Sequence, residues 1–413
     1  SYLVSIMADI VIRNAFLRKY GKTYDLSIRE GRITKIGRVE EKGELEIDAE
    51  GRLVTESFVN PHLHMCKVYT FQIIGEEAVK HYHGEMMSGA MTAIELASKI
   101  KERYHESWIY ENARKAALEA LKHGCTHIRA FVDTDTKARL EGVKAILKLR
   151  DELRGVLDIK VVAFPQDGIL RDPGAEDLIW RAVEMGCDEV GGIPWIEYTE
   201  RDELLHIDKM FEVAKRYDKD VAMLTDDAGD ASLRTTEMLA VKAIREGWVG
   251  RVTACHARAM QLYPEPYFRK LVHLLKEADM NIVSDPHTGP LHARVRELLS
   301  HGVNVAFGQD DIADAYYPYG RNKMLEVAFL NSHLLWMTAP ADMETLYDMI
   351  TVNAAKSMNV KNHVLEEGGK ANLVILNARS VYEAIWIQAE PLYVISNGKL
   401  VVENEEKTTF HIK

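Results

Sequence analysis

The sequence predicts an α/β protein, a (β/α)8 TIM barrel with a small β-sandwich domain built from both termini. Three observations predict this fold. Short apolar strands alternate with stretches of helical period through the middle of the chain, strand patterns fill both ends, and polar residues follow the middle strands. Eight strand–helix units favour a closed barrel over an open doubly wound sheet.

The strand-rich ends define the smaller domain. Residues 8–56 read as short strands separated by turn residues, and residues 371–377 and 392–403 show the same pattern. We therefore expect residues 1–56 and 361–413 to form the two parts of the β-sandwich, and residues 57–360 to form the barrel. A chain of 413 residues is long enough for a barrel-sized domain plus a smaller one.

Each expected barrel strand is short and apolar, and most end at a polar side chain. The strands lie at 57–66, 125–133, 158–166, 188–194, 220–227, 251–256, 281–286 and 303–311. The helical stretches lie at 111–123, 135–153, 176–185, 203–217, 232–246, 264–278 and 291–301. The polar strand ends are His62, His64, Asp133, Gln166, Asp226, Asp227, His256, Asp310 and Asp311. Barrel enzymes carry out their chemistry on the face where such strand ends meet.

Composition excludes several function classes. The net charge of −11 repels phosphate backbones and no basic run offsets it, so no nucleic-acid partner is expected. The four cysteines are scattered without a Cys-x-x-Cys pair, which argues against a disulfide framework and a zinc-thiolate site. No stretch approaches 18 uncharged apolar residues, and the apolar N-terminus lacks a basic region. We expect a cytoplasmic protein with no membrane partner, acting as a homo-oligomer on a small molecule.

The strand at 57–66 ends in the pattern P-H-L-H, which places two histidines at i and i+2. Successive strand side chains alternate faces, so His62 and His64 point the same way and can bind one metal ion. The alternative is a vestigial or core pair, but the strand-end position favours a metallohydrolase. A second pair, His81 and His83, lies in a polar segment without a strand and is interpreted as surface or lid.

These segments resemble the amidohydrolase superfamily, and within it the group of bacterial cytosine deaminases and N-isopropylammelide amidohydrolase. The similarity runs from about residue 9 to residue 402. It is carried by P-H-L-H (61–64), V-V-A-F-P-Q-D-G-I (161–169), V-G-G-I-P-W-I-E-Y-T (190–199), R-V-T-A-C-H-A-R-A-M (251–260), G-Q-D-D-I-A-D-A-Y-Y-P (308–318) and L-V-I-L-N-A (373–378).

The resemblance implies one divalent metal ion per chain, zinc or iron, held by His62, His64 and Asp310. It implies that His256 lies beside the reacting water, and that Asp310 and an acid after the fifth strand move protons. It also implies that Gln166 binds a ring amide. The residues expected to contact substrate are Gln166, Lys67, Trp195, Asp311 and Tyr316.

Four positions depart from the family pattern. Leu224 stands where the third metal histidine is expected, and Asp227 where the catalytic glutamate is expected. Phe131 and Gln309 each replace a histidine. Leucine cannot bind a metal, so two arrangements remain open. Either His256 becomes a fourth ligand, or three protein ligands leave one position open for water.

It is also open which aspartate after the fifth strand shuttles protons, because Asp226 lies next to Asp227. The sequence thus predicts an enzyme, a metal-dependent hydrolase that cleaves a C–N bond of a small nitrogen heterocycle by deamination or dealkylamination. Cytosine, a triazine, an imidazolone and a modified pyrimidine remain alternative rings. Two further alternatives are a ring-opening amidohydrolase and, because of Leu224, a catalytically impaired ligand-binding barrel.

Overall fold

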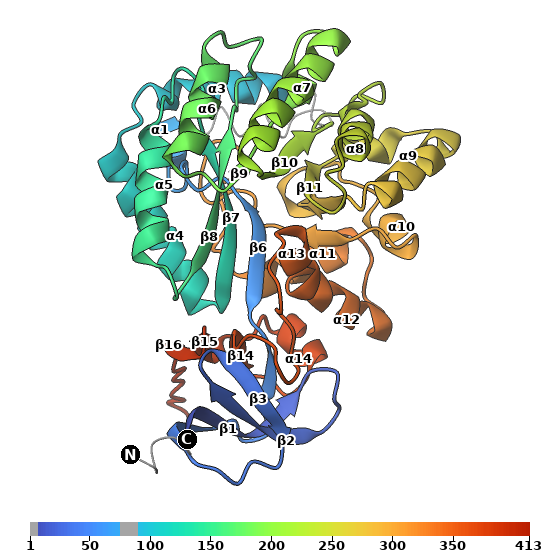
Figure 1. Ribbon diagram of the computed structural model, residues 1–413. Coiled ribbons are helices and arrows are strands. Elements are labelled where there is room, and N and C mark those ends of the chain that lie inside the picture. Colours follow the sequence, from blue (N-terminus) through green and yellow to red (C-terminus); the bar gives the residue numbers. More distant parts are fainter. Residues whose placement is uncertain (1–6, 75–89) are drawn as a thin grey trace.

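The computed structural model describes residues 7–74 and 90–413, and Figure 1 shows them as a large barrel above a smaller sheet. Within these residues the barrel has eight parallel strands, each paired with the next along the chain. They are β6 (Phe58–Leu63), β7 (Cys125–Asp133), β8 (Asp158–Phe164), β9 (Glu189–Val190), β10 (Asp220–Thr225), β11 (Val252–His256), β12 (Asn281–Ser284) and β13 (Val305–Phe307). A parallel bridge between Leu63 and Asp310 returns the sheet to its first strand, which confirms the predicted barrel.

Helices surround this sheet. Among the described residues they are α1 (Phe71–Ile74), α3 (Ala90–Lys101), α4 (Glu106–Lys122), α5 (Glu141–Glu152), α6 (Ala175–Met185), α7 (Glu200–Tyr217), α8 (Thr235–Glu246), α9 (Glu265–Glu277), α10 (Val295–Ser300), α11 (Met324–Leu334), α12 (Pro340–Met349) and α13 (Val352–Ser357). Within the same residues, no helix combines the length and apolar character needed to cross a bilayer. The predicted pair His81 and His83 lies outside the described residues.

Several predicted elements are shorter than the pattern suggested, among them the helix expected at 291–301 and the strand expected at 303–311, and two of them have a visible cause. The helix expected at 135–153 begins at Glu141, because Asp135 instead accepts hydrogen bonds from the amides of Lys137 and Ala138 in a loop. The strand expected at 188–194 is only Glu189–Val190. Gly192 follows it so closely packed that a β-carbon there would lie 2.7 Å from the sulfur of Met223.

The smaller sheet is built from both ends of the chain, as predicted. Its strands are β1 (Ala8–Leu17), β2 (Thr23–Arg29), β3 (Arg32–Gly37), β4 (Gly43–Asp48), β5 (Leu53–Glu56), β14 (Leu373–Leu376), β15 (Pro391–Ser396) and β16 (Lys399–Glu403). One edge of β1 pairs with β4 along its first half and with β5 at its end, so the sheet divides there. The pairing of β5 with β14 joins the two chain ends. We propose the division 1–56, 57–360 and 361–413 on these element limits.

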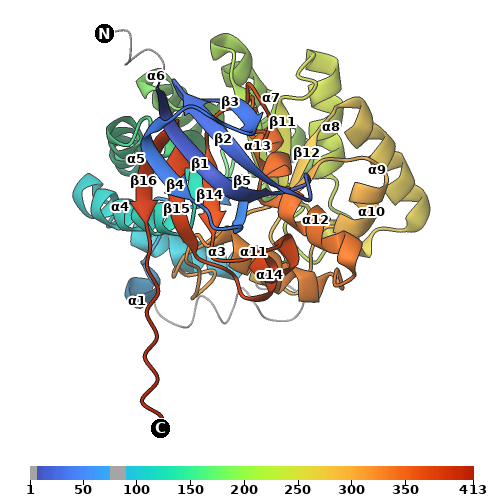
Figure 2. The same ribbon diagram turned by 90° about the horizontal axis from the view of Figure 1, so that it is seen from below.

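The barrel interior is apolar below the predicted site. Fully buried side chains from several strands fill it: Val59, Phe131, Val162, Phe164, Ala222, Cys255, Val283 and Ala306. A separate apolar cluster lies inside the small sheet. Figure 2, seen from the side of the small sheet, shows that sheet lying across one end of the barrel. The opposite ends of the barrel strands carry the polar residues.

Arg18, just after β1, links the small sheet to the barrel helices. Its guanidinium is fully buried and pairs with Glu56 at 3.4 Å, with Glu344 at 3.0 Å and with Asp348. It also lies 4.5 Å from the ring centroid of Tyr347. Three carboxylates thus converge on one buried cation.

Replacing Arg18 by Met is expected to lower the free energy of unfolding by about 3–5 kcal/mol, because the buried Glu56 carboxylate loses its counter-charge. Arg13→Met is the matched control, since Arg13 pairs with Glu46 at a partly exposed position and surface pairs contribute about 1 kcal/mol or less. Urea denaturation followed by circular dichroism measures both. Equal losses in the two variants would contradict the buried role.

Candidate metal centre and active site

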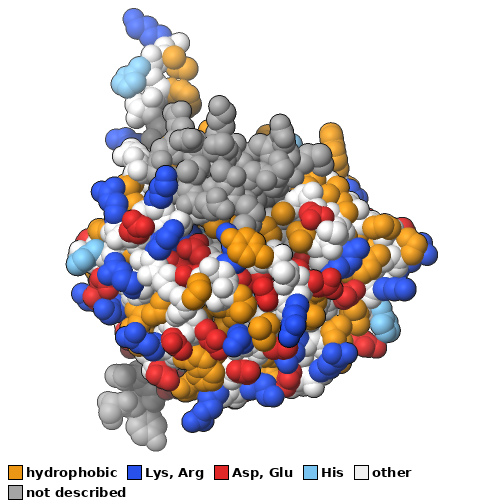
Figure 3. Space-filling view, turned by 90° about the horizontal axis from the view of Figure 1, so that it is seen from above, with side chains coloured by type: hydrophobic (Ala, Val, Ile, Leu, Met, Phe, Trp, Pro, Cys, Tyr) orange, Lys and Arg blue, Asp and Glu red, His pale blue; other side chains and the backbone are white. Residues whose placement is uncertain are grey.

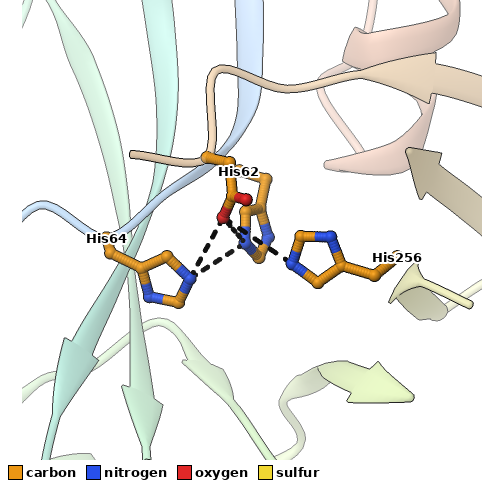
Figure 4. Close-up of side chains that lie close together, drawn as sticks. His62, His64 and His256 are labelled. Atoms are coloured by element: carbon orange, nitrogen blue, oxygen red, sulfur yellow. Dashed lines mark hydrogen bonds and ion pairs between the residues drawn. The ribbon is translucent and has the colours of Figure 1, made fainter. Parts of the chain in front are cut away.

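Four predicted side chains meet at the carboxyl ends of three barrel strands. His62 and His64 end β6, His256 ends β11, and Asp310 follows β13. The Asp310 Oδ1 atom lies 3.1 Å from His62 Nε2, 3.3 Å from His64 Nε2 and 3.6 Å from His256 Nε2. Figure 4 shows the three rings and the carboxylate pointing toward one another. All four are buried, and their ligand atoms lie within 4.8 Å of one another.

This donor set fits a divalent metal ion. The imidazole nitrogens of His62 and His64 and a carboxylate oxygen of Asp310 are ligands that zinc and iron prefer, and the His256 ring is the candidate for a fourth. The Asp310 Oδ1 atom is buried and accepts no hydrogen bond from the part of the chain that the structure describes. Burial alone would raise the pKa of Asp310, but the facing rings of His256, His62 and His64 hold it well below its usual range.

The protonation states of His64 and His256 also suit metal binding. Burial lowers the pKa of His64 to about 4, and burial likewise lowers the pKa of His256 well below its ordinary value. Both rings are therefore neutral at neutral pH, as a metal ligand must be.

The backbone holds two of these residues in strained conformations. His256 has φ +74° and Asp310 has φ +70°, which is the left-handed region that non-glycine residues rarely adopt. The backbone of Asp310 donates to His62 O at 2.8 Å and accepts from His64 N at 2.8 Å. The seam between the first and last barrel strands therefore fixes His62, His64 and Asp310 together.

Arg258, which the sequence analysis missed, supports this cluster. Its Nε donates to Asp227 Oδ1 at 2.8 Å, and its Nη2 donates to Thr288 Oγ1 at 2.6 Å. The Thr288 hydroxyl in turn lies 3.0 Å from Asp310 Oδ2. The only sequence signal is the short spacing in H-A-R at 256–258.

Arg258 also contacts the ring of His256. Its Nη2 lies 3.3 Å from His256 Nδ1, and a guanidinium can only donate hydrogen bonds. As the acceptor of this bond, Nδ1 leaves the proton of the neutral ring on Nε2, which faces Asp310. In that tautomer Nε2 donates a hydrogen bond, and in the other tautomer it can bind a metal.

The two adjacent aspartates after β10 have different surroundings. Asp226 accepts from the backbone amides of Thr235 and Thr236 at 2.7 and 2.9 Å, at the start of α8. The Tyr263 hydroxyl, at 3.0 Å, also donates to it. Asp227 instead lines the cavity beside the cluster of three histidines and Asp310. Burial raises the pKa of Asp227 to about 7, with Arg258 opposing the rise and Asp310 adding to it.

A small cavity of about 20 Å³ lies next to the cluster, which is room for about one water molecule. The described residues that line it include most of the predicted site: His64, Ile94, Gln166, Ile193, Leu224, Asp227, His256, Asp310, Asp311 and Tyr316. Trp195 is not among these residues, but it packs in the same apolar cluster as the lining residues Leu224 and Tyr316.

Lys67 holds one wall of the cavity in place. Its Nζ donates to Gln166 Oε1 at 2.8 Å and lies 3.3 Å from Asp133 Oδ2. Burial lowers the pKa of Lys67, but Asp133 together with Cys66, Asp314 and Asp311 outweighs this effect and leaves that pKa above its usual range. Lys67 therefore stays charged, and because it occupies the amide oxygen of Gln166, the Nε2 of Gln166 is the end left to donate.

Asp311 lies on the same wall and was predicted to contact substrate. Burial, with the nearby Asp310 and Asp314 carboxylates, raises the pKa of Asp311 well above its usual range. The Asp311 Oδ1 atom finds no hydrogen-bond partner in the described part of the chain. A neutral carboxyl group can both donate and accept, so Asp311 can complement either end of a ring amide.

The positions that depart from the family pattern also surround the cluster. Leu224 lines the cavity without offering a donor atom. The Phe131 ring lies 4.4 Å from the His62 ring, centroid to centroid, and packs against the ligands. The Gln309 Oε1 atom accepts from the amides of Arg321 and Asn322, so Gln309 holds the loop after β13.

Comparisons with known proteins agree with this architecture. Residues 45–402 match the amidohydrolase family. The chain belongs to that family. This confirms the resemblance seen in the sequence motifs.

This amidohydrolase is 34% identical to N-isopropylammelide isopropyl amidohydrolase from Pseudomonas sp. (strain ADP), over 96% of this chain and 98% of that protein. The crystal structure of 5-methylcytosine deaminase from Klebsiella pneumoniae with 5-fluorocytosine matches with TM-score 0.90 and 31% identity, over 97% of this chain and 99% of that one. N-isopropylammelide isopropylaminohydrolase from Burkholderia multivorans matches with TM-score 0.84 and 25% identity, over 96% and 99%.

The double variant His62→Ala/His64→Ala of this amidohydrolase is expected to lose its divalent metal, because two imidazole donors disappear. Elemental analysis of purified protein measures the metal content per chain. His81→Ala/His83→Ala is the matched control, since it removes a His-x-His pair of equal spacing. If the His62/His64 variant retained as much metal as the control, the proposed centre would be wrong.

Leu224→His is expected to tighten metal binding, because it adds a neutral donor facing the cluster. The expected gain is at least about tenfold, the size of effect that removing a group behind a ligand typically has. Competition with a chelator measures the affinity, and Leu224→Phe adds a ring of similar bulk without a donor. Equal affinity in both folded variants would show that position 224 does not face the metal.

Proposed function

We propose that this chain is a metal-dependent hydrolase that cleaves an exocyclic C–N bond of a small nitrogen heterocycle, by deamination or dealkylamination. The observation that carries the proposal is the small cavity on which His64, His256, Asp310, Asp227 and Gln166 converge. Membership of the amidohydrolase family and the deaminase and amidohydrolase activities named for its relatives support it.

One divalent ion, zinc or iron, is proposed to be held by His62, His64 and Asp310. When bound, such an ion supplies Lewis-acid chemistry and lowers the pKa of water. We propose His256 as a hydrogen-bond donor rather than a fourth ligand, because Arg258 leaves the proton on its Nε2. This assignment favours three protein ligands with one position open, the arrangement typical of catalytic sites.

Asp227 is the proposed proton shuttle. A carboxyl group with a pKa near 7 can accept and donate a proton at neutral pH, which suits general acid–base catalysis. Its ion pair with Arg258 fixes one oxygen and leaves the other, which lies 3.9 Å from His256 Nε2, toward the reacting centre. Asp226 is committed to the start of α8, so its proposed role is structural.

Substrate orientation is assigned to Gln166, Lys67, Asp311 and Tyr316. With its oxygen bound by Lys67, Gln166 offers its amide hydrogens to a ring carbonyl. We therefore propose a ring that carries an oxo group as well as the amino or alkylamino group that is removed. The substrates named for the relatives, N-isopropylammelide and 5-methylcytosine, guide the choice of compounds to test.

Leu224 favours a second candidate function, a ligand-binding barrel without hydrolysis, because it removes a donor from the centre. The experiment is a screen of cytosine, 5-methylcytosine and N-isopropylammelide with detection of released ammonia or amine. Release that depends on added zinc or iron supports the hydrolase. Tight binding of these rings by metal-loaded protein without any release would support the second candidate.

We further propose that the protein works in the cytoplasm as a homo-oligomer, without nucleic-acid or membrane partners. All four cysteines are buried and unpaired, as expected in a reducing compartment. Large apolar side chains on the surface, including Trp336 at 77% and Trp386 at 61% exposure, support contact with another chain.

Asp227→Asn is expected to lower kcat by about 10²–10⁴-fold with little change in KM, because the amide cannot shuttle a proton. Gln166→Ala is expected to raise KM by about tenfold, the value of one hydrogen bond. Steady-state kinetics on the first substrate found separates the two.

Asp226→Asn is the matched control for Asp227→Asn. It weakens the hydrogen bonds at the start of α8, so it should lower the free energy of unfolding by about 1 kcal/mol while retaining kcat. Loss of kcat in Asp226→Asn but not in Asp227→Asn would move the proton shuttle by one residue.

A further inference from the structure

The motif V-G-G-I-P-W-I-E-Y-T at 190–199 contains a buried carboxylate that the proposed mechanism does not use. Glu197 follows the short turn after β9 and is only 6% exposed. Its Oε2 atom accepts from the backbone amides of Ile169 and Leu170 at 3.0 and 3.2 Å, and its Oε1 atom accepts from the amide of Arg171 at 3.0 Å. Three successive amides of the loop after β8 therefore bind one carboxylate from the loop after β9.

A buried histidine on α7 contacts the same carboxylate. His206 is fully buried, and its Nδ1 atom lies 2.7 Å from Glu197 Oε2. Its Nε2 atom accepts from the backbone amide of Ile193 at 3.0 Å. A backbone amide can only donate, so the proton of the neutral ring is on Nδ1, and His206 donates it to Glu197. Both ring nitrogens of His206 therefore bind the segment that follows β9.

These hydrogen bonds keep Glu197 charged. Burial alone would raise the pKa of Glu197, but the hydrogen bonds from His206 and from the amides of Ile169 and Arg171 hold that pKa below its ordinary value. A charged acceptor forms stronger hydrogen bonds than a neutral one. The link between the loops after β8 and β9 is therefore a charge-assisted one at neutral pH.

Close packing at Gly168 accompanies this link. Gly168 has φ +85°, and a β-carbon there would lie 2.9 Å from Glu197 Oε1. The Gly168 amide donates to Pro165 O at 2.9 Å, which closes a tight turn whose second residue is Gln166. The carboxylate thus approaches the loop at a position where only glycine fits without strain.

The two linked loops each supply a wall of the small cavity. Gln166 comes from the loop after β8 and Ile193 from the loop after β9, and both line the cavity. Glu197 and His206 themselves are not among the described residues that line it. Their hydrogen bonds therefore join a polar wall of the cavity to an apolar wall from behind.

Solvent does not compete for these hydrogen bonds. Figure 3 shows the face of the molecule opposite the small sheet, where acidic, basic and apolar side chains are interspersed on the described surface. Glu197 and His206 are both buried and do not contribute to a surface patch. A hydrogen bond in such surroundings is electrostatically stronger than one in water, so the position of one loop is transmitted to the other.

We propose that Glu197 and His206 are a positioning pair that couples the loops carrying Gln166 and Ile193 and so sets the shape of the cavity between them. The proposal rests on the proposed function in one respect, that a ring binds in this cavity. Loss of the pair should then weaken ring binding, while the metal ligands and the proton shuttle keep their places.

Amide hydrogen exchange tests the coupling on the full-length protein without any substrate. His206→Phe keeps the bulk of the ring but removes both hydrogen bonds. The amides of residues 169–171 should then exchange at least about tenfold faster, although their own acceptor, Glu197, is unaltered. His206→Asn keeps a donor toward Glu197 and should restore slow exchange at 169–171, while the amide of residue 193 still exchanges faster. Glu197→Gln, a weaker and uncharged acceptor, is an independent variant and should also speed exchange at 169–171.

His363→Phe is the matched control. His363 is also buried and binds Ser57 O, at the opposite end of the barrel strands. This variant loses a buried histidine as His206→Phe does, but it should leave exchange at residues 169–171 unchanged.

Steady-state kinetics supply the functional readout, with metal-loaded protein and either 5-methylcytosine or N-isopropylammelide. His206→Phe should raise KM by about tenfold and leave kcat within about threefold, with unchanged metal content. His206→Asn should recover part of the loss in KM, and His363→Phe should not change KM. If the unaltered protein neither turned over nor bound these rings, the proposed function would be wrong, whereas amide exchange would still decide the coupling.

Three results would overturn the proposal. Unchanged exchange at residues 169–171 in both His206→Phe and Glu197→Gln would show that the loops are not coupled. Equal effects of His206→Phe and His363→Phe would reduce the pair to general stabilisation. An unchanged KM in His206→Phe, on a substrate that the unaltered protein turns over, would show that the pair does not shape the cavity.

Discussion

The candidate centre depends on the seam that closes the barrel. Two backbone hydrogen bonds cross it, from Asp310 N to His62 O and from His64 N to Asp310 O. These two bonds join the first and last strands, and they also align His62, His64 and Asp310. Because these residues belong to the sheet rather than to long loops, the donor atoms are held before any ion arrives. The same alignment holds the backbone of Asp310 in the strained left-handed region.

Around that seam, charges are balanced by one buried guanidinium. The carboxylates of Asp227, Asp285 and Asp310 lie close together on the barrel face, and Arg258 contacts two of them while hydrogen-bonding the carbonyl of the third. Burial and the neighbouring Asp310 raise the pKa of Asp285 well above its usual range, which favours its neutral form. The remaining negative charge is concentrated where a cation is expected.

Much of this could be predicted from local patterns. The alternation of strands and helices predicted the barrel, strand-rich ends predicted the smaller sheet, and motifs around His62, His256 and Asp310 identified groups that the fold brings together. Arg258 could not be predicted, because its partners come from the ends of three strands and converge only in the folded barrel. The different surroundings of Asp226 and Asp227 could not be predicted for a related reason. The two side chains are adjacent in sequence but have different neighbours, and only Asp226 accepts hydrogen bonds from the start of α8.

Element limits and pocket walls were harder to predict. The two-residue β9 shows that a glycine pair can end a strand whose apolar pattern continues, because close packing replaces pairing. Trp195, in the short turn after β9, joins the apolar cluster that also holds the lining residues Leu224 and Tyr316, so its contact with substrate stays a prediction. Side-chain direction after a strand depends on backbone turns that residue type alone does not determine.

The pairing of β5 with β14 also sets an order of events during synthesis. Strand β5 leaves the ribosome early, while its partner β14, more than three hundred residues later, follows the whole barrel. Until then one edge of β5 has no neighbour, and an open strand edge is prone to associate with other chains. All the barrel strands are therefore synthesised before the smaller sheet can be completed. A chain that ends after α13 would keep β5 as an unpaired strand edge that can associate with other chains.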